Sequence, residues 1–372
     1  MNMDGLMKRI FLPLMLGGAL LVQSAAGVAD TLTLKAGHPD TYLVKKGDTL
    51  WDISAHFLDD PWRWPTLWGA NPQIANPHLI YPGDRLTLVF INGEPRLVVK
   101  PLVRQSPQGR IQPKTGAVPV VDLALIRPYL IQNRVVAPDW LASQPVVLGG
   151  ESPSRHHIAG DIIYVQGALT AGTKVGLYTG GRVFSRQQDG EVLGQEAILT
   201  AAGQVVSSGE ISKVKLLTSY RESKAGNRIL SIDDSALLPI YFMPRAAQVS
   251  TPAHVLASGI DIREMGKLDV VYLDRGAIDG VTAGDVFAVH RPGDTVVFNH
   301  DNQPVSSLER SRYENMLAAV SDTSIQLPPI YHGQIMVFKT FERTSLGLIM
   351  VNERPVRVHD KLSSPQPPLL GE

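Results

Sequence analysis

The stretch YLVKKGDTLWDISAHF, residues 42–57, changes from strand-like to helix-like character within a few residues. Its extended start ends at Gly47, which supplies a sharp turn. Thr49 and Asp52 have the spacing of a capping box, in which the threonine begins a helix. The apolar residues that follow recur at helical spacing and predict one buried helical face: Leu50, Ile53 and Phe57.

A second helix and a closing strand are predicted directly downstream. The segment DDPWRWPTLWGANP (59–72) predicts a short helix, because its apolar residues recur at helical spacing. HLIYPGDRLTLV (78–89) predicts a turn followed by a strand. The order over residues 41–91 is therefore strand, helix, helix, strand. A module this small needs aromatic area to bury, so we expect Trp62 to be exposed and three other tryptophans to form the core: Trp51, Trp64 and Trp68.

These residues resemble the lysin motif (LysM), a peptidoglycan-binding module. Three pieces carry the resemblance: YLVKKGDTLWDIS (42–54), WGANPQI (68–74) and NPHLIYPGDRLTL (76–88). The insertion LDDPWRWP (58–65) departs from the shortest family pattern. The resemblance implies a β-α-α-β fold that binds glycans containing N-acetylglucosamine, such as peptidoglycan or chitin.

The resemblance also implies where the sugar binds. In the family, a shallow groove lies between the first strand-helix turn and the loop before the last strand. An acetamido sugar offers one amide donor and one carbonyl acceptor, which the backbone of such turns can pair. Carried onto this chain, the glycan-binding residues are Gly47, Asp48, Thr49 and Leu50 on one lip, and Leu79, Ile80 and Tyr81 on the other.

The rest of the chain is predicted to be mostly β. Its first part is rich in Pro and polar residues, which indicates a linker with a short ordered segment. Its second part alternates short apolar runs with Gly-containing turns, which is typical of strands. The predicted class is α+β: a β-α-α-β LysM module followed by a mostly-β domain. The predicted ranges are a signal peptide at 1–29, the module at 41–91, the linker at 92–158, the β domain at 159–362 and a tail at 363–372.

An internal duplication is predicted within the β domain, with copies near 159–232 and 267–362. Its period is too long for a solenoid repeat. A weaker echo pairs the segment at Gly209 with the segment at Gly333. The main match aligns five residues at one constant offset, namely Asp161, Tyr164, Val165, Gly172 and Gly176 with Asp269, Tyr272, Leu273, Gly280 and Gly284.

The first thirty residues predict export. Lys8 and Arg9 precede the apolar run IFLPLMLGGALLV (10–22), and the small residues of QSAAGVAD (23–30) follow. This is the order of a secretory signal peptide, and the run is shorter than the ~20 residues needed to span a bilayer. We expect cleavage within AAGVA, after Ala26 or Ala29. The mature chain is then exported to the periplasm or cell envelope, with no transmembrane segment.

Composition excludes several kinds of chemistry. Basic and acidic residues balance at 35 each, which argues against nucleic-acid binding. The chain has no cysteine, so thiol nucleophiles and thiolate metal sites are excluded. No His-x-His or His-Glu-x-x-His motif accompanies its three His-x-x-x-Asp matches, and no metal site or cofactor is predicted. The one Ser-x-x-Lys, Ser212 to Lys215, lies in a strand-like run and is predicted to be structural.

The sequence therefore predicts a non-catalytic peptidoglycan-binding protein, with no catalytic residue assigned. In this hypothesis the module tethers the chain to the cell wall, and the β domain contacts another envelope protein or folds back on the module. Two alternatives stay open. One is a cell-wall hydrolase with an unrecognised β-type catalytic domain, which buried paired carboxylates in a cleft would favour. The other is an accessory protein of an envelope or secretion complex.

Overall fold

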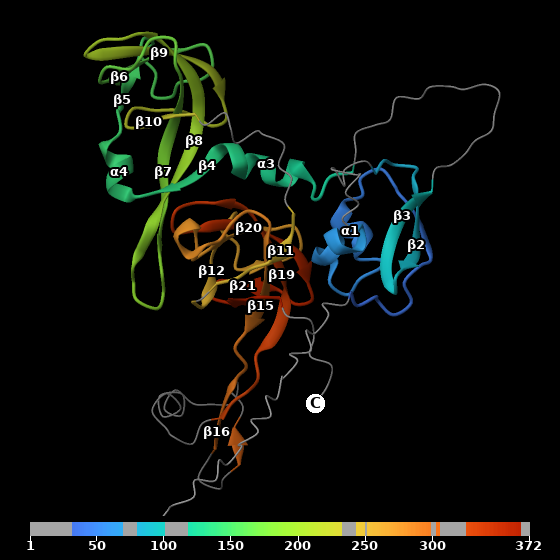
Figure 1. The fold of residues 1–372 in the computed structure, drawn as a ribbon. Helices are drawn as coiled ribbons and strands as arrows, with labels where there is room; N and C mark the ends of the chain where they lie inside the picture. Colours follow the sequence, from blue (N-terminus) through green and yellow to red (C-terminus); the bar gives the residue numbers. More distant parts are fainter. Residues whose placement is uncertain are drawn as a thin grey trace, which may run out of the picture. The chain divides into compact units, whose positions relative to one another are not determined.

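The structure is a computed structural model that describes residues 32–69, 80–100, 118–232, 243–249, 251–298, 303–305 and 325–365 (Figure 1). The predicted signal peptide, Leu79 and most of the predicted tail lie outside these residues. The described helices are short, and even the longest, α3 (Leu123–Gln132), has ten residues. None of the described helices is long and apolar enough to cross a membrane.

The N-terminal module has the predicted strand, helix, helix, strand order. Thr49 begins the first helix as predicted, since its Oγ1 accepts the Asp52 N–H at 3.1 Å. Trp51 and Trp64 are buried as predicted, whereas Trp62 and Trp68 are both partly buried against the core. Strands β1 and β2 pair antiparallel. The elements are β1 (Thr41–Leu43), α1 (Leu50–Ser54), the 3-10 helix η1 (Pro61–Arg63), α2 (Trp64–Leu67) and β2 (Arg85–Ile91).

A third strand extends the module past its predicted end. Strand β3 (Glu94–Lys100) forms a hairpin with β2, so the sheet order is β1-β2-β3. The two-residue turn is Asn92–Gly93, with φ of 54° and 84°. Two positive φ angles are what a tight hairpin turn requires, and Asn-Gly adopts them readily. The module's sheet therefore continues into the range that was predicted as a linker.

The described parts of the predicted linker, 92–100 and 118–158, are more ordered than their composition predicts. Helix α3 begins at Asp122, whose carboxylate accepts the Ala124 N–H at 2.9 Å. The connection then continues as regular structure up to and into the first barrel. Its further elements are β4 (Asn133–Val136), α4 (Pro138–Ser143) and β5 (Val147–Gly150).

Of the seven strands that the described residues contribute to the next sheet, six close into a first barrel, and β4 pairs with β8 outside the ring. The order β10-β7-β8-β9-β6-β5 closes where the bridge Val146–Arg228 and the Val147 N–H to Asn227 O bond (2.9 Å) join its ends. Buried Val, Leu and Ile side chains fill the interior. The remaining strands are β6 (Ile162–Gln166), β7 (Lys174–Ser185), β8 (Val192–Ser207), β9 (Ile211–Ser219) and β10 (Arg228–Ser231).

A second barrel closes in the same way from described strands. Its order is β15-β19-β20-β14-β12-β22, and the pairing of β15 with β22 completes the ring. Strand β11 (Arg245–Ala246) adds to β15 in parallel outside the ring. The ring strands are β12 (Ala253–Ser258), β14 (Val270–Leu273), β15 (Asp285–Arg291), β19 (Ile330–Thr340), β20 (Ser345–Asn352) and β22 (Lys361–Ser363). Two small sheets join β13 (Glu264–Met265) to β21 (Val356–Arg357), and β16 (Thr295–Phe298) to β17 (Pro304–Val305) and β18 (Ile325–Gln326).

The two barrels have the same strand order. Numbered along the chain, each ring runs 1-2-5-4-3-6, so that β5 corresponds to β12 and β6 to β14. The aspartates of the predicted repeat make matching contacts. Asp161 accepts the Ile158 N–H at 3.0 Å, and Asp269 accepts the Gly266 N–H at 2.7 Å. Both rings start earlier than the predicted copies, which began at 159 and 267.

The glycines of the repeat correspond differently from the prediction. Gly172 and Gly284 both have positive φ, 83° and 99°, and each donates its N–H to the adjacent strand of its ring at 2.8 Å, to Val205 O and Val337 O respectively. They therefore occupy the same place in the two barrels, whereas constant spacing had paired Gly172 with Gly280. The 3-10 turn η3 (Ala277–Asp279) precedes β15 and shifts the register.

The weaker echo in the sequence is wrong. Gly209 leads into β9, the fifth strand of its ring, but Gly333 lies within β19, the fourth strand of the other ring. Similar apolar runs arise in any buried antiparallel strand, so this likeness reflects shared burial and not equivalent position.

Candidate functional site

The first predicted lip is a capped turn. Gly47 has φ of +94°, a value that favours glycine. The Asp48 carboxylate accepts the Lys45 N–H at 2.8 Å and the Tyr42 hydroxyl at 3.0 Å. Thr49 is 7% exposed and Leu50 is fully buried. Side chains therefore hold this lip from within, and what it can offer a ligand is mainly backbone.

The chain next to the second predicted lip is hydrogen-bonded to the chain next to the first. The Val44 N–H donates to Asp84 O at 2.9 Å, and the Gly83 N–H donates to Val44 O at 2.8 Å. The Tyr81 N–H donates to the Asp84 carboxylate at 2.9 Å, and the Tyr81 residue is half-buried. Ile80 is only 4% exposed. Leu79 lies outside the described residues.

The chain's own residues 118–121, here called the strap, lie between the two lips. The Leu50 N–H donates to Pro119 O at 2.9 Å, and the Val118 N–H donates to Ile80 O at 2.8 Å. Each lip thus gives one backbone group to the strap. The structure brings the two predicted lips together, but a third segment that the sequence did not point to fills the space between them.

The stability of the first lip depends on pH through the Tyr42 hydroxyl. Burial, and then the hydrogen bond to Asp48, raises the pKa of Tyr42 from 10.0 to about 12. The folded state therefore holds the phenol proton more tightly, and its stabilising effect is complete below pH 10 and lost as pH rises toward 12. We expect Asp48→Asn to lower the midpoint of this tyrosinate titration, measured as absorbance against a Tyr42→Phe reference. An unchanged midpoint would contradict the assigned contact.

The serine of the Ser-x-x-Lys pattern and one histidine of the His-x-x-x-Asp patterns contact neighbouring parts of the fold. The Ser212 hydroxyl donates to Gly167 O at 2.7 Å and accepts the Leu169 N–H at 3.0 Å, so it ties β9 to a loop. His157 is 1% exposed, and its Nδ1 lies 3.8 Å from the Asp161 carboxylate. Among the described residues, no three His, Asp or Glu side chains are grouped so as to hold a metal ion.

A pocket of about 290 Å³ contains two carboxylates of unequal environment. Glu196 is 3% exposed and accepts from the Tyr272 hydroxyl at 2.7 Å and from the Asn133 amide at 3.0 Å. The Asp261 side chain is 93% exposed, and Arg182 lies between the two, 3.4 Å from Glu196 and 3.8 Å from Asp261. These two carboxylates are therefore not the buried pair that would favour a glycoside-cleaving enzyme.

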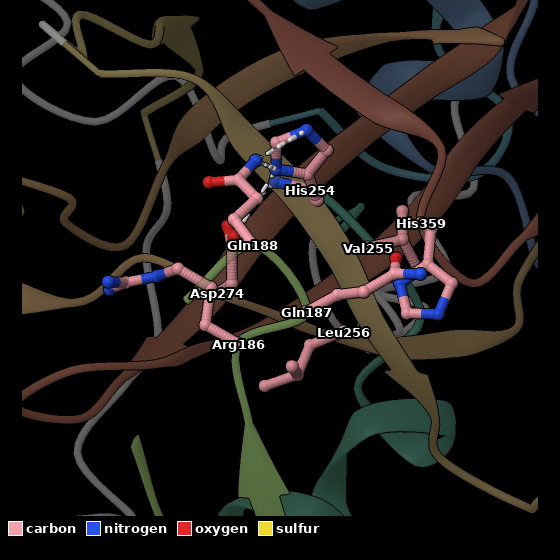
Figure 2. Close-up of a pocket in the computed structure, with 8 residues that line it drawn as sticks. All are labelled: Arg186, Gln187, Gln188, His254, Val255, Leu256, Asp274 and His359. Atoms are coloured by element: carbon pink, nitrogen blue, oxygen red, sulfur yellow. Dashed lines mark hydrogen bonds and ion pairs between the residues drawn. The ribbon is translucent and has the colours of Figure 1, made fainter. Parts of the chain in front are cut away.

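A second pocket, of about 280 Å³, lies where the β7–β8 hairpin meets β12 (Figure 2). The His254 ring lies between the Gln188 amide, 3.1 Å from Nδ1, and the Asp274 carboxylate, 3.3 Å from Nδ1. Asp274 also accepts the His254 backbone N–H at 2.7 Å. His359 and Leu256 line other parts of the wall.

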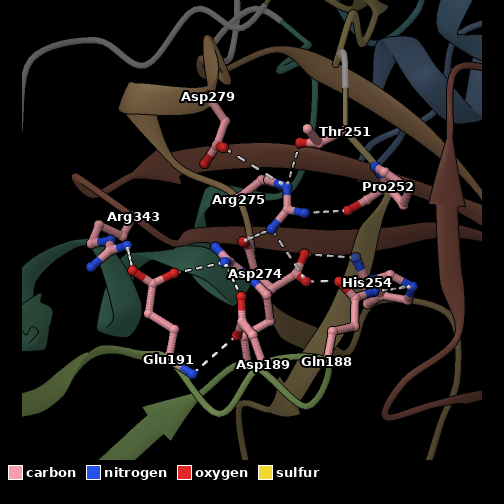
Figure 3. A network of polar contacts seen from close by, with 11 residues as sticks. Gln188, Asp189, Glu191, Thr251, Pro252, His254, Asp274, Arg275, Asp279 and Arg343 are labelled. Carbon is pink, nitrogen blue, oxygen red and sulfur yellow. Dashed lines mark hydrogen bonds and ion pairs between the residues drawn. The ribbon is translucent and has the colours of Figure 1, made fainter.

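Figure 3 shows that the polar groups around this pocket are already joined to one another. Arg275 is 5% exposed, donates to Thr251 Oγ1 at 3.0 Å and lies 3.4 Å from the Asp274 carboxylate. Glu191 at the hairpin tip pairs with Arg343, and this hydrogen bond lowers the pKa of the Glu191 carboxyl. The network fits a contact that holds the hairpin to the second barrel.

Comparisons with known proteins identify the module. The family model of the LysM domain matches residues 42–89. Over 60 residues the chain is 40% identical to the uncharacterized protein YqbP of Bacillus subtilis strain 168, a match that covers 13% of this chain and 27% of that protein. The chain thus spans about a quarter of this relative's length. The family match places a LysM domain at residues 42–89 and supports glycan binding of the peptidoglycan or chitin type.

Proposed function

We propose that this is an exported, non-catalytic peptidoglycan-binding protein, in which the LysM module anchors two β-barrels in the cell envelope. The single observation that carries the proposal is the LysM match at residues 42–89. Export rests on the signal-like sequence of residues 1–29.

The geometry of the lips supports a small acetylated ligand. Leu50 contributes an N–H donor on one side and Ile80 a carbonyl acceptor on the other, and each group is hydrogen-bonded to the strap. An N-acetyl group needs one acceptor for its N–H and one donor for its carbonyl. One such site binds weakly, because a single module gains nothing from multivalency. The barrels are then expected to add a second contact in the envelope, with another protein.

We infer that the two barrels are copies of one ancestral unit, because they share one strand order and equivalent turn aspartates at Asp161 and Asp269. Non-catalytic barrels agree with the state of their polar groups. The carboxylate oxygens of Glu196 and Asp274 are paired with neighbouring donors within the fold. Two barrels held together by such contacts could present a binding surface to another envelope protein.

The experiment is retention of the mature chain on purified peptidoglycan, with a matched chain lacking residues 32–100, while released muropeptides are measured. We expect the deletion to abolish retention and the intact chain to release nothing. Retention by the deleted chain would contradict anchoring by the module. Release of muropeptides by the intact chain would establish the hydrolase alternative instead.

A single side chain on the second lip is expected to matter. Tyr81 is half-buried, and Tyr81→Ala removes its aromatic area beside the groove while the backbone of the lip is kept. We expect retention to fall about fivefold, corresponding to ~1 kcal/mol of lost contact. The control is Tyr220→Ala, which removes a tyrosine 41% exposed beyond β9 on the first barrel. Equal losses in both variants would mean that the groove is placed wrongly.

A further inference from the structure

The strap makes the contacts that a bound glycan would be expected to make. Its Val118 N–H pairs with the Ile80 carbonyl at 2.8 Å, and its Pro119 carbonyl pairs with the Leu50 N–H at 2.9 Å. One donor and one acceptor are also what an acetamido group offers. Pro119 has no N–H of its own, so its nitrogen leaves no donor unpaired inside the groove.

The backbone donor on the first lip can serve only one partner at a time. A carbonyl oxygen such as Ile80 O has two lone pairs and can accept twice, but the Leu50 N–H is a single donor. It already points at Pro119 O. A sugar carbonyl that used this donor would have to take the place of the strap.

Apolar burial holds the strap in place. Val118, Val120 and Val121 are 3%, 4% and 2% exposed and belong to the same apolar cluster as Leu50 and Ile80. Three valine side chains would return to water if the strap left, and that would oppose its release. The strap is also part of the same chain, so its local concentration at the groove is far above that of a free peptide.

We propose that the strap is the resident ligand of the LysM groove and that peptidoglycan enters only when residues 118–121 leave it. This inference rests on the proposed glycan binding. The groove is thus a site for an extended apolar peptide as well as for a sugar, and the two ligands exclude each other. Anything that pulls the strap away would increase wall binding without changing the module.

The test uses the mature chain and two strap variants. Val120→Asp places a charge in the apolar contact, and the triple alanine variant at Val118, Val120 and Val121 weakens it without a charge. The control is Val206→Asp, at a valine 55% exposed on β8. We measure amide exchange at Leu50 and retention on purified peptidoglycan. If the competent form is about a tenth of the wild-type chain, apparent affinity for peptidoglycan rises about tenfold when the strap is released.

A synthetic peptide of residues 117–122, added in excess to the triple alanine variant, should slow Leu50 exchange again and reverse the gain in retention. Faster Leu50 exchange together with stronger retention supports the proposal. Faster exchange with unchanged retention, while the chain lacking residues 32–100 is not retained, overturns it and leaves glycan binding intact. If no chain is retained, glycan binding itself fails. Leu50 exchange unchanged in both strap variants would show that the strap does not occupy the groove.

Discussion

Replacing Glu196 by alanine is expected to lower the free energy of unfolding by about 3 kcal/mol, because it removes a buried acceptor that three donors share. Glu196 accepts from the Tyr272 hydroxyl at 2.7 Å and the Asn133 amide at 3.0 Å, and Arg182 Nε lies 3.4 Å away. Tyr272 is fully buried. Burial, and then the nearby charge of Glu196, raises the pKa of Tyr272, so its hydroxyl stays protonated and loses its acceptor when the carboxylate is removed.

Two variants separate this network from a general effect of losing a glutamate. Glu196→Gln keeps an oxygen that can accept from Tyr272, and we expect it to cost about 1 kcal/mol. Glu210→Ala removes an exposed glutamate of the first barrel and should leave the urea midpoint unchanged. If Glu196→Ala and Glu210→Ala unfold at the same urea concentration, the network contributes little to stability.

The local features of the module are predictable from its sequence because short-range chemistry determines them. Thr49 and Asp52 are three residues apart, and the predicted cap is the one observed. The same local rules also indicate strand β3, although this strand was not predicted. Asn92–Gly93 between two apolar runs is a strong hairpin signal, and the proline-rich sequence that follows obscured it.

Contacts between distant residues are harder to predict. Barrel closure depends on Val146 meeting Arg228 and on β15 meeting β22, and no local pattern marks these pairs. The strap is a stronger example. The three valines of the strap look like any short apolar run, and only the fold reveals that they lie in the groove. The lip residues were predicted from family resemblance, but a competing ligand within the chain lies beyond what that resemblance implies.

The predicted alignment of the repeat glycines is wrong for a related reason. Constant spacing aligned Gly176 with Gly284, because these glycines have the same offset as the matching aspartates and Tyr164 with Tyr272. The structure instead aligns Gly172 with Gly284, because these two of the four repeat glycines combine a positive φ with an N–H bond to the adjacent strand. An insertion of one short turn, η3, is enough to move a glycine match away from structural equivalence.

Replacing Lys339 by methionine is expected to lower the free energy of unfolding by about 2 kcal/mol, as expected for charge-assisted hydrogen bonds. The Lys339 ammonium on β19 donates to the carbonyls of Leu130 and Asn133 at 2.7 Å each and of Tyr129 at 3.2 Å. The last carbonyls of a helix lack partners within the helix, so this lysine satisfies the end of α3. Methionine keeps an apolar stem but removes the donor and its charge, which also lies 5.3 Å from the centre of the Phe341 ring.

The same substitution should also reach the groove, because α3 follows the strap directly in the chain. Asp122 follows the strap and caps the helix, so the helix that Lys339 holds at one end fixes residues 118–121 at the other. We expect faster amide exchange at Val118 and Leu50 in Lys339→Met, together with the lower urea midpoint. The control Lys215→Met changes an exposed lysine on β9 and should alter neither quantity. A lower midpoint with unchanged exchange at Leu50 would mean that α3 stabilises the barrels but does not hold the strap.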